Sequence, residues 1–142
     1  MADEFKNKTA TMPKTPEAER LVVQRAGQGL FRAALLDYWQ GKCCVTGLDV
    51  PELLRASHIR PWAQCETDEQ RLDVFNGLLL APHLDALIDA GLMTVDAAGV
   101  VQLSAKLTVE RRTALGLHGE LKVAALRAEH HAYLDFHRMN VW

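Results

Sequence analysis

The segment from residue 76 to residue 91, NGLLLAPHLDALIDAG, constrains the fold more than any other because it carries a clear signal for each local structure in turn. Asn-Gly is a turn signal, and the apolar run LLLA after it is typical of a short strand. Pro82 suits the first position of a helix, and Gly91 suits the position just beyond its end. The segment therefore predicts a turn, a short strand and a helix of about ten residues.

A second short strand is expected shortly before this unit, in the stretch RASHIRPW at 55–62. Ile59 and Trp62 suit a pleated, partly buried segment, and Pro61 lacks a backbone donor and should end the strand. His58 then lies at a strand end, where functional sites are commonly built. Taken alone, the stretch favours an ordinary half-buried histidine.

The N-terminal part of the chain predicts helices. Apolar residues recur at helical spacing from Glu17 to about Gln40, and GQG at 27–29 predicts a break between two helices. Residues 1–15 show almost no apolar periodicity, so we expect them to be a flexible arm.

The C-terminal part predicts a hairpin followed by helices. Strands are expected at 92–95 and 100–103, joined by a turn, and helices at 107–116 and 122–138. His130, His131 and His137 lie on the last of these helices without the acid and spacing of a zinc motif, which favours structural or solvated roles.

The composition is typical of one globular domain. The chain has 142 residues, of which 49% are hydrophobic, so it can bury a substantial core. No apolar run approaches the roughly 18 residues of a membrane span, and the N-terminus lacks the apolar core of a signal peptide. We therefore expect a single domain over residues 16–142, a cytoplasmic location and no membrane partner.

Charge and cysteine content exclude little but limit the metal chemistry. A formal net charge of -2 does not indicate nucleic-acid binding, although a local basic groove remains compatible with this charge. Cys43, Cys44 and Cys65 are odd in number and form no CxxC pair, which argues against a disulfide framework and a four-cysteine zinc site. We expect Cys43 and Cys44 to be core thiols.

An acidic pair stands out on the predicted helix at 82–90. Asp85 and Asp89 are four residues apart, so both carboxylates leave the same face and repel each other. Asp89 also lies in the last turn, where the helix dipole disfavours an anion. A bound cation or an arginine would compensate, and a solvated helix face is the alternative. His83 points away from this face, because residues two apart on a helix diverge by roughly 200°.

The order of His58, Asn76, Asp85 and Asp89 resembles the motif of HNH endonucleases of the ββα-metal class. Six phrases also resemble one bacterial HNH subfamily, over about residues 25–142: GQGLFRAALLDYW, CCVTG, ASHIRPW, RLDVFNGLLL, LDALIDAGL and YLDFHRMNVW. The resemblance implies an α+β fold with a ββα-metal core, flanking N- and C-terminal helices and a C-terminal β-hairpin.

The resemblance also implies roles in metal-dependent DNA cleavage. His58 would be the general base, Asn76 would orient it, and Asp85 and Asp89 would hold one divalent ion, Mg²⁺ or Mn²⁺. Many family members carry Asp or His just before the base, where this chain has Ser57, a poor ligand. Either the ion binds weakly until a DNA phosphate completes its shell, or serine is normal for the subfamily.

The partner implied is DNA, double-stranded by expectation. Arg60, Arg55 and Arg71 are candidates to hold its phosphates, each with an ion-pair or surface role as the alternative. The short chain has no evident recognition module, so we expect either weak sequence specificity or a targeting partner protein. Two other classes remain open: a catalytically silent DNA-binding or protein-interaction module that keeps the fold, and a small metal-binding regulator.

Overall fold

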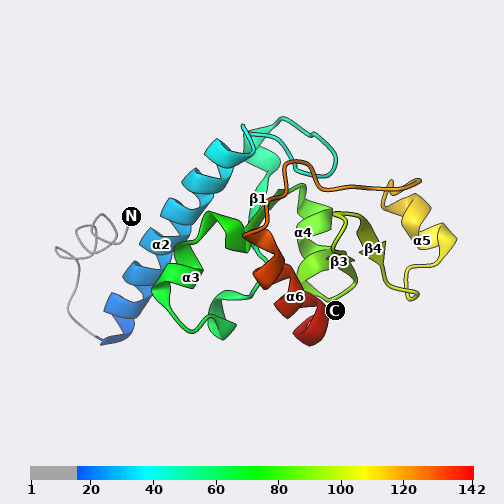
Figure 1. The fold of residues 1–142 in the computed structure, drawn as a ribbon. Coiled ribbons are helices and arrows are strands. Elements are labelled where there is room, and N and C mark those ends of the chain that lie inside the picture. Colours follow the sequence, from blue (N-terminus) through cyan, green and yellow to red (C-terminus); the bar gives the residue numbers. More distant parts are fainter. Residues whose placement is uncertain (1–15) are drawn as a thin grey trace.

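The computed structural model describes residues 16–142, which form a mixed α+β structure with two small antiparallel sheets (Figure 1). The flexible arm expected at 1–15 lies outside the described residues. The helices, short 3-10 turns (η) and strands are α2 Pro16–Tyr38, η1 Pro51–Leu53, β1 Arg55–His58, η2 Trp62–Gln64, α3 Asp68–Leu72, η3 Val74–Asn76, β2 Gly77–Leu80, α4 Pro82–Asp89, β3 Met93–Val95, β4 Val101–Leu103, α5 Val109–Ala114 and α6 His130–Asn140.

The strand and helix expected from residues 76–91 are confirmed, and so is the strand that ends at His58. β1 pairs antiparallel with β2, and the register places His58 opposite Gly77. α4 begins with Pro82 at its first turn, ends before Gly91 in the left-handed conformation (φ 71°), and packs against both strands. His58 therefore lies at the end of a short hairpin covered by α4.

The hydrophobic core surrounds β2. All of its residues are buried, so neither face of the strand reaches solvent. Phe31 and Leu35 of α2 are fully buried, as are Leu84 of α4 and Leu134 of α6. Cys43 and Cys44 are free, buried thiols within the same cluster, as expected.

The break expected at 27–29 is wrong, because α2 is one continuous helix from Pro16 to Tyr38. A glycine inside a helix costs about 1 kcal/mol relative to alanine, and neither glycine removes a backbone donor as proline would. The buried side chains Leu30, Phe31 and Leu35 follow directly. Their packing outweighs the local preference of the glycines.

The helix expected at 122–138 is correct only from residue 130 onward. Residues 122–125 pair with distant backbone instead. Lys122 forms a β-bridge with Val100, and the amide of Val123 donates to the carbonyl of Gly99 at 2.9 Å. The amide of Ala124 donates to the carbonyl of Cys44 at 2.8 Å. Ala125 has a positive φ of 53°, which no helix contains. Tertiary pairing therefore replaces the first part of the expected helix.

The C-terminal hairpin and the short helix after it are confirmed as β3, β4 and α5. α6 packs against β3, and the buried His137 fastens it there. Its Nε2 lies 2.9 Å from the carbonyl of Ile88, and its Nδ1 lies 2.7 Å from the hydroxyl of Thr94. His137 thus has a structural position between α4, β3 and α6. No helix in the described range 16–142 has the length and hydropathy needed to cross a membrane.

Replacement of Gly77 by alanine tests how closely α2 packs on the hairpin. A Cβ at Gly77 would lie 2.4 Å from Cζ of Phe31 and 2.8 Å from a methyl group of Leu35. Overpacking of this kind costs about 1–3 kcal/mol, so Gly77→Ala should lower the free energy of unfolding by that amount in urea denaturation. Gly29→Ala is the control, because nothing lies within 4 Å of its Cβ and alanine favours the helix. Equal stability of the two variants would contradict this packing.

Candidate functional site

His58 is held on two sides by aromatic rings. Its imidazole stacks on Phe31 of α2, with ring centroids 3.8 Å apart and planes at 11°. Trp62 of η2 meets it edge-on at 5.6 Å. The ring is therefore fixed in position and only partly exposed.

A backbone carbonyl determines the tautomer of His58. Its Nε2 lies 2.8 Å from the carbonyl oxygen of Arg71. A carbonyl only accepts, so Nε2 carries the proton and donates, and Nδ1 keeps the lone pair. Burial is the main cause that lowers the pKa of His58, and the positive charge of Arg71 also lowers it. His58 is thus neutral at pH 7, with Nδ1 able to accept a proton.

Asn76 connects the segments on both sides of His58. Its side chain is fully buried, and its Oδ1 accepts from the amide of Arg60 at 2.7 Å. Its Nδ2 donates to the carbonyls of Arg60 (3.2 Å) and Gln70 (3.0 Å) and to the sulfur of Cys65 (3.4 Å). Asn76 makes no direct contact of this kind with His58. It fixes the peptide next to the Arg71 carbonyl, and so positions the histidine indirectly.

Asp85 and Asp89 of α4 face the same hollow as His58. The hollow has a volume of about 330 Å³ and is lined by Ala56, Ser57, His58, Pro61, Trp62, Asp85 and Asp89. Although Asp89 is exposed as a whole residue, burial of its carboxyl and then repulsion by Asp85 raise its pKa from 3.8 to about 6. The two carboxylates therefore repel each other, as their spacing predicts. His83 is not among the residues that line this hollow.

Ser57 supplies an unusual polar group at the same hollow. It is 2% exposed, and its hydroxyl has no hydrogen-bond partner in the described structure. A buried polar atom without a partner costs about 1–3 kcal/mol, unless something outside the chain satisfies it. The hollow thus contains hard oxygen donors from three residues. Among residues 16–142, no group of three or more His, Cys, Asp or Glu side chains is placed to hold a metal.

The arginines expected to hold phosphates differ in how far they are engaged. Arg60 donates to the carbonyl of Gln64 and pairs with Glu66 at 3.1 Å, and its guanidinium lies over the ring of Phe136. Arg55 is exposed at the start of β1, with one long contact of 3.5 Å to a neighbouring carbonyl.

Arg71 is engaged as fully as Arg60. It pairs with Asp68 at 3.0 Å and donates to the carbonyls of Trp62 and Cys65. As phosphate ligands, all three arginines remain predictions. The geometry favours Arg55, whose guanidinium has no carboxylate partner among the described residues.

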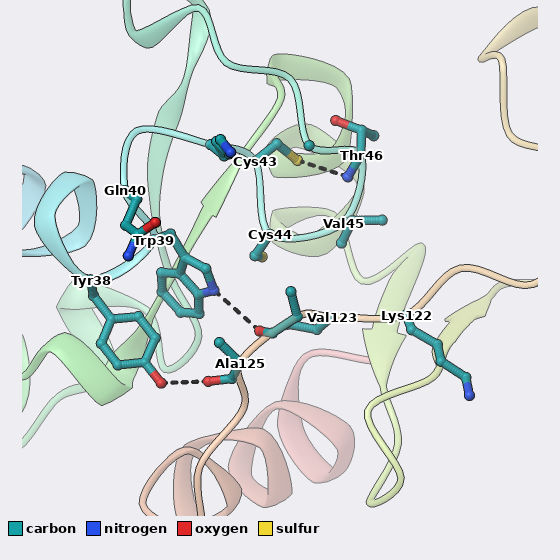
Figure 2. Close-up of a pocket in the computed structure, with 13 residues that line it drawn as sticks. Tyr38, Trp39, Gln40, Cys43, Cys44, Val45, Thr46, Lys122, Val123 and Ala125 are labelled. Atoms are coloured by element: carbon teal, nitrogen blue, oxygen red, sulfur yellow. Dashed lines mark hydrogen bonds between the residues drawn. The ribbon is translucent and has the colours of Figure 1, made fainter.

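A larger hollow, of about 590 Å³, lies away from His58, between the end of α2 and residues 122–125 (Figure 2). Figure 2 shows Tyr38 and Trp39 directed at this segment, where they donate to the carbonyls of Ala125 and Ala124. The residues that line it include no histidine and no carboxylate. This hollow therefore lacks the combination of a histidine and two carboxylates that lines the smaller hollow at His58.

The family comparison agrees with this geometry. Residues 43–96 match the family model of HNH endonucleases, a range that spans β1, β2 and α4. This part of the chain is therefore similar to HNH endonucleases. No curated protein matches the sequence.

Two contacts of His58, with the ring of Phe31 and with the carbonyl of Arg71, leave no clear signal in the sequence. Phe31 was expected only as part of an amphipathic helix, and apolar spacing does not distinguish a ring beneath a histidine from any other core residue. The carbonyl of Arg71 belongs to the backbone, which leaves no signal in residue type. Phe31 is the aromatic residue among the buried positions of α2, which are Gly27, Leu30, Phe31 and Leu35, and this is the hint that the sequence offers.

The pKa of Asp89 provides a test of the acidic pair. Carboxyl NMR titration of the metal-free protein should give a value near 6 for Asp89, and Asp85→Asn should lower it without restoring 3.8, because burial is the larger cause. A raised pKa means that ionisation of Asp89 weakens the folded state. The contribution of Asp89 to the free energy of unfolding should therefore fall as pH rises from about 4 to about 7, so the stability of the wild type relative to Asp89→Asn should decrease over this range. An ordinary pKa for Asp89 would contradict the shared hollow.

Proposed function

We propose that this protein is a metal-dependent DNA endonuclease. The observation that carries the proposal is the single hollow in which a neutral histidine with a free Nδ1 meets the carboxylates Asp85 and Asp89. The match to HNH endonucleases supports nuclease activity in general. In this proposal β1, β2 and α4 form the ββα-metal core, within one domain over residues 16–142.

The donor set fits one hard divalent ion. Asp85 and Asp89 would hold Mg²⁺ or Mn²⁺, which prefer carboxylate and hydroxyl oxygens and keep several waters. The unpartnered hydroxyl of Ser57 lines the same hollow and is an additional oxygen at the position before His58. When bound, such an ion stabilises the negative charge that develops on the phosphate and on the leaving oxygen.

His58 would act as the general base. Its Nδ1 takes a proton from water, and the resulting hydroxide attacks the phosphorus of a phosphodiester. The Arg71 carbonyl keeps the second ring nitrogen protonated and stabilises the positive imidazolium once the proton arrives. Phe31 and Trp62 keep the ring from rotating, and Asn76 positions the loop that supplies the carbonyl. Double-stranded DNA is the substrate we propose.

Plasmid cleavage tests the function. Supercoiled plasmid should be nicked or linearised with Mg²⁺ or Mn²⁺ and left intact with EDTA. His58→Ala should lower the rate about a hundredfold or more while the protein stays folded, the usual effect of losing a general base. His131→Ala, on α6, is the matched control and should cleave normally. Intact plasmid with every metal, together with retarded DNA in a gel, would instead support a silent DNA-binding module.

Calorimetry tests the carboxylates separately. Asp85→Asn and Asp89→Asn should each weaken Mn²⁺ binding and slow cleavage, with Asp85 the more sensitive. His83→Ala should change either property by less than about threefold, because helical geometry directs it away from Asp85. A manganese-bound structure with His83 as ligand and Asp85 free would refute this assignment.

A further inference from the structure

A second hollow adjoins the one that contains the carboxylates. It also has a volume of about 330 Å³, and its lining residues come from α2 and β1: Gln28, Phe31, Arg32, Arg55, Ala56 and His58. Ala56 and His58 line both hollows. His58 therefore stands at the boundary between them.

The two hollows carry opposite charge. Asp85 and Asp89 line the first, whereas the second has Arg32 and Arg55 and no acidic residue in its lining. Within residues 16–142, neither arginine forms an ion pair with a carboxylate. Their positive charges are thus uncompensated, in a chain whose net charge is -2.

Arg32 is oriented by neutral partners. Its two terminal nitrogens donate to the carbonyls of Leu54 and Pro51, each at 2.7 Å. These bonds hold the guanidinium in place without cancelling its charge. Arg55 is exposed, and the amide of the exposed Gln28 adds donors that carry no charge. The held guanidinium of Arg32, the exposed guanidinium of Arg55 and the neutral amide of Gln28 together suit an anion such as phosphate.

We propose that this second hollow binds a DNA backbone phosphate that neighbours the scissile phosphate on the same strand. The proposal rests on the proposed function, because it assumes that the scissile phosphate occupies the carboxylate-lined hollow. A DNA strand carries a phosphate at every nucleotide, so a strand held at His58 presents a neighbouring phosphate to the surface beside it. The strand would then run from the α4 side of His58 to the α2 side.

Contacts of this kind position a strand without reading its sequence. The second hollow should therefore affect how tightly DNA binds and should leave the chemistry at a single phosphate unchanged. A small diester such as bis(p-nitrophenyl) phosphate has one phosphate and cannot occupy both hollows. Comparison of the two substrates separates binding at the second hollow from catalysis at the first.

The experiment uses Arg55→Ala and Gln28→Ala, because both side chains are exposed. Arg32 is left intact, since its bonds to Leu54 and Pro51 support the start of β1. Lys106→Ala is the matched control: Lys106 is exposed and shortly precedes α5 in the sequence, and Figure 1 shows α5 on the opposite side of the molecule from α2. Binding of a fluorescein-labelled duplex in EDTA is measured by anisotropy against salt, and cleavage of the duplex and of the small diester is measured with Mn²⁺.

Arg55→Ala should weaken duplex binding about tenfold, raise KM for the duplex similarly, and reduce the salt slope by about 1, as loss of one phosphate contact does. Gln28→Ala should weaken binding less and leave the slope unchanged. Hydrolysis of the small diester should stay within about twofold in both variants. The proposal would be overturned if Arg55→Ala bound the duplex with the same affinity and salt slope as Lys106→Ala. It would also be overturned if Arg55→Ala lost activity equally on the duplex and on the small diester.

The same data distinguish failure of this proposal from failure of the proposed function. If the wild-type protein cleaves neither substrate with any metal, the endonuclease assignment fails. Weaker duplex binding by Arg55→Ala, with the smaller salt slope, would then still establish the phosphate site. Unchanged binding in an active enzyme would remove the phosphate site and leave the endonuclease intact.

Discussion

The buried amide of Asn76 is the contact on which the candidate site depends. It satisfies backbone groups of Arg60 and Gln70, which belong to segments on either side of the hairpin end. Neither segment has regular structure long enough to hold itself. A buried amide with all these partners is costly to disturb, because each lost bond leaves a polar group unsatisfied. Asn76 is therefore the buried support of the loop around His58, and the guanidinium groups of Arg60 and Arg71 add bonds to carbonyls of the same loop.

Burial is the main cause that lowers the pKa of His58, and charged groups of both signs lie around the ring. Carboxylates lie on one side, and on the other lie guanidinium groups that have no ion pair within residues 16–142; aromatic rings and a carbonyl surround the remaining edges. Arg60 and Arg71 are close to the same loop, but their charges are balanced by Glu66 and Asp68. Arg60, Arg71 and Arg32 contribute to the framework through these pairs and through bonds to carbonyls, whereas Arg55 is exposed.

Local sequence signals predicted the parts of the molecule that local interactions decide. Pro82 lies at the start of α4 and Gly91 just beyond its end, as their residue types predict. The acidic pair on that helix lines the same hollow as His58. Prediction failed where distant contacts decide the backbone. Residues 122–125 have the composition of a helix, but the carbonyls of Gly99 and Cys44 accept hydrogen bonds from Val123 and Ala124 that a helix would forgo. The roles of the site residues are proposals that the fold makes physically reasonable.

The continuity of α2 has a consequence for how the chain tolerates changes of length. Phe31 reaches His58 because its angular position on the helix is fixed relative to Leu35, which packs on the same hairpin. One inserted residue between Phe31 and Tyr38 would rotate the helix on one side of it by about 100° relative to the other. Insertion nearer Pro16 would rotate only the part that lies before the contact. The second half of α2 is therefore sensitive to insertions and deletions, and only the turns before Val23, which precede the packing against Leu72, can absorb them.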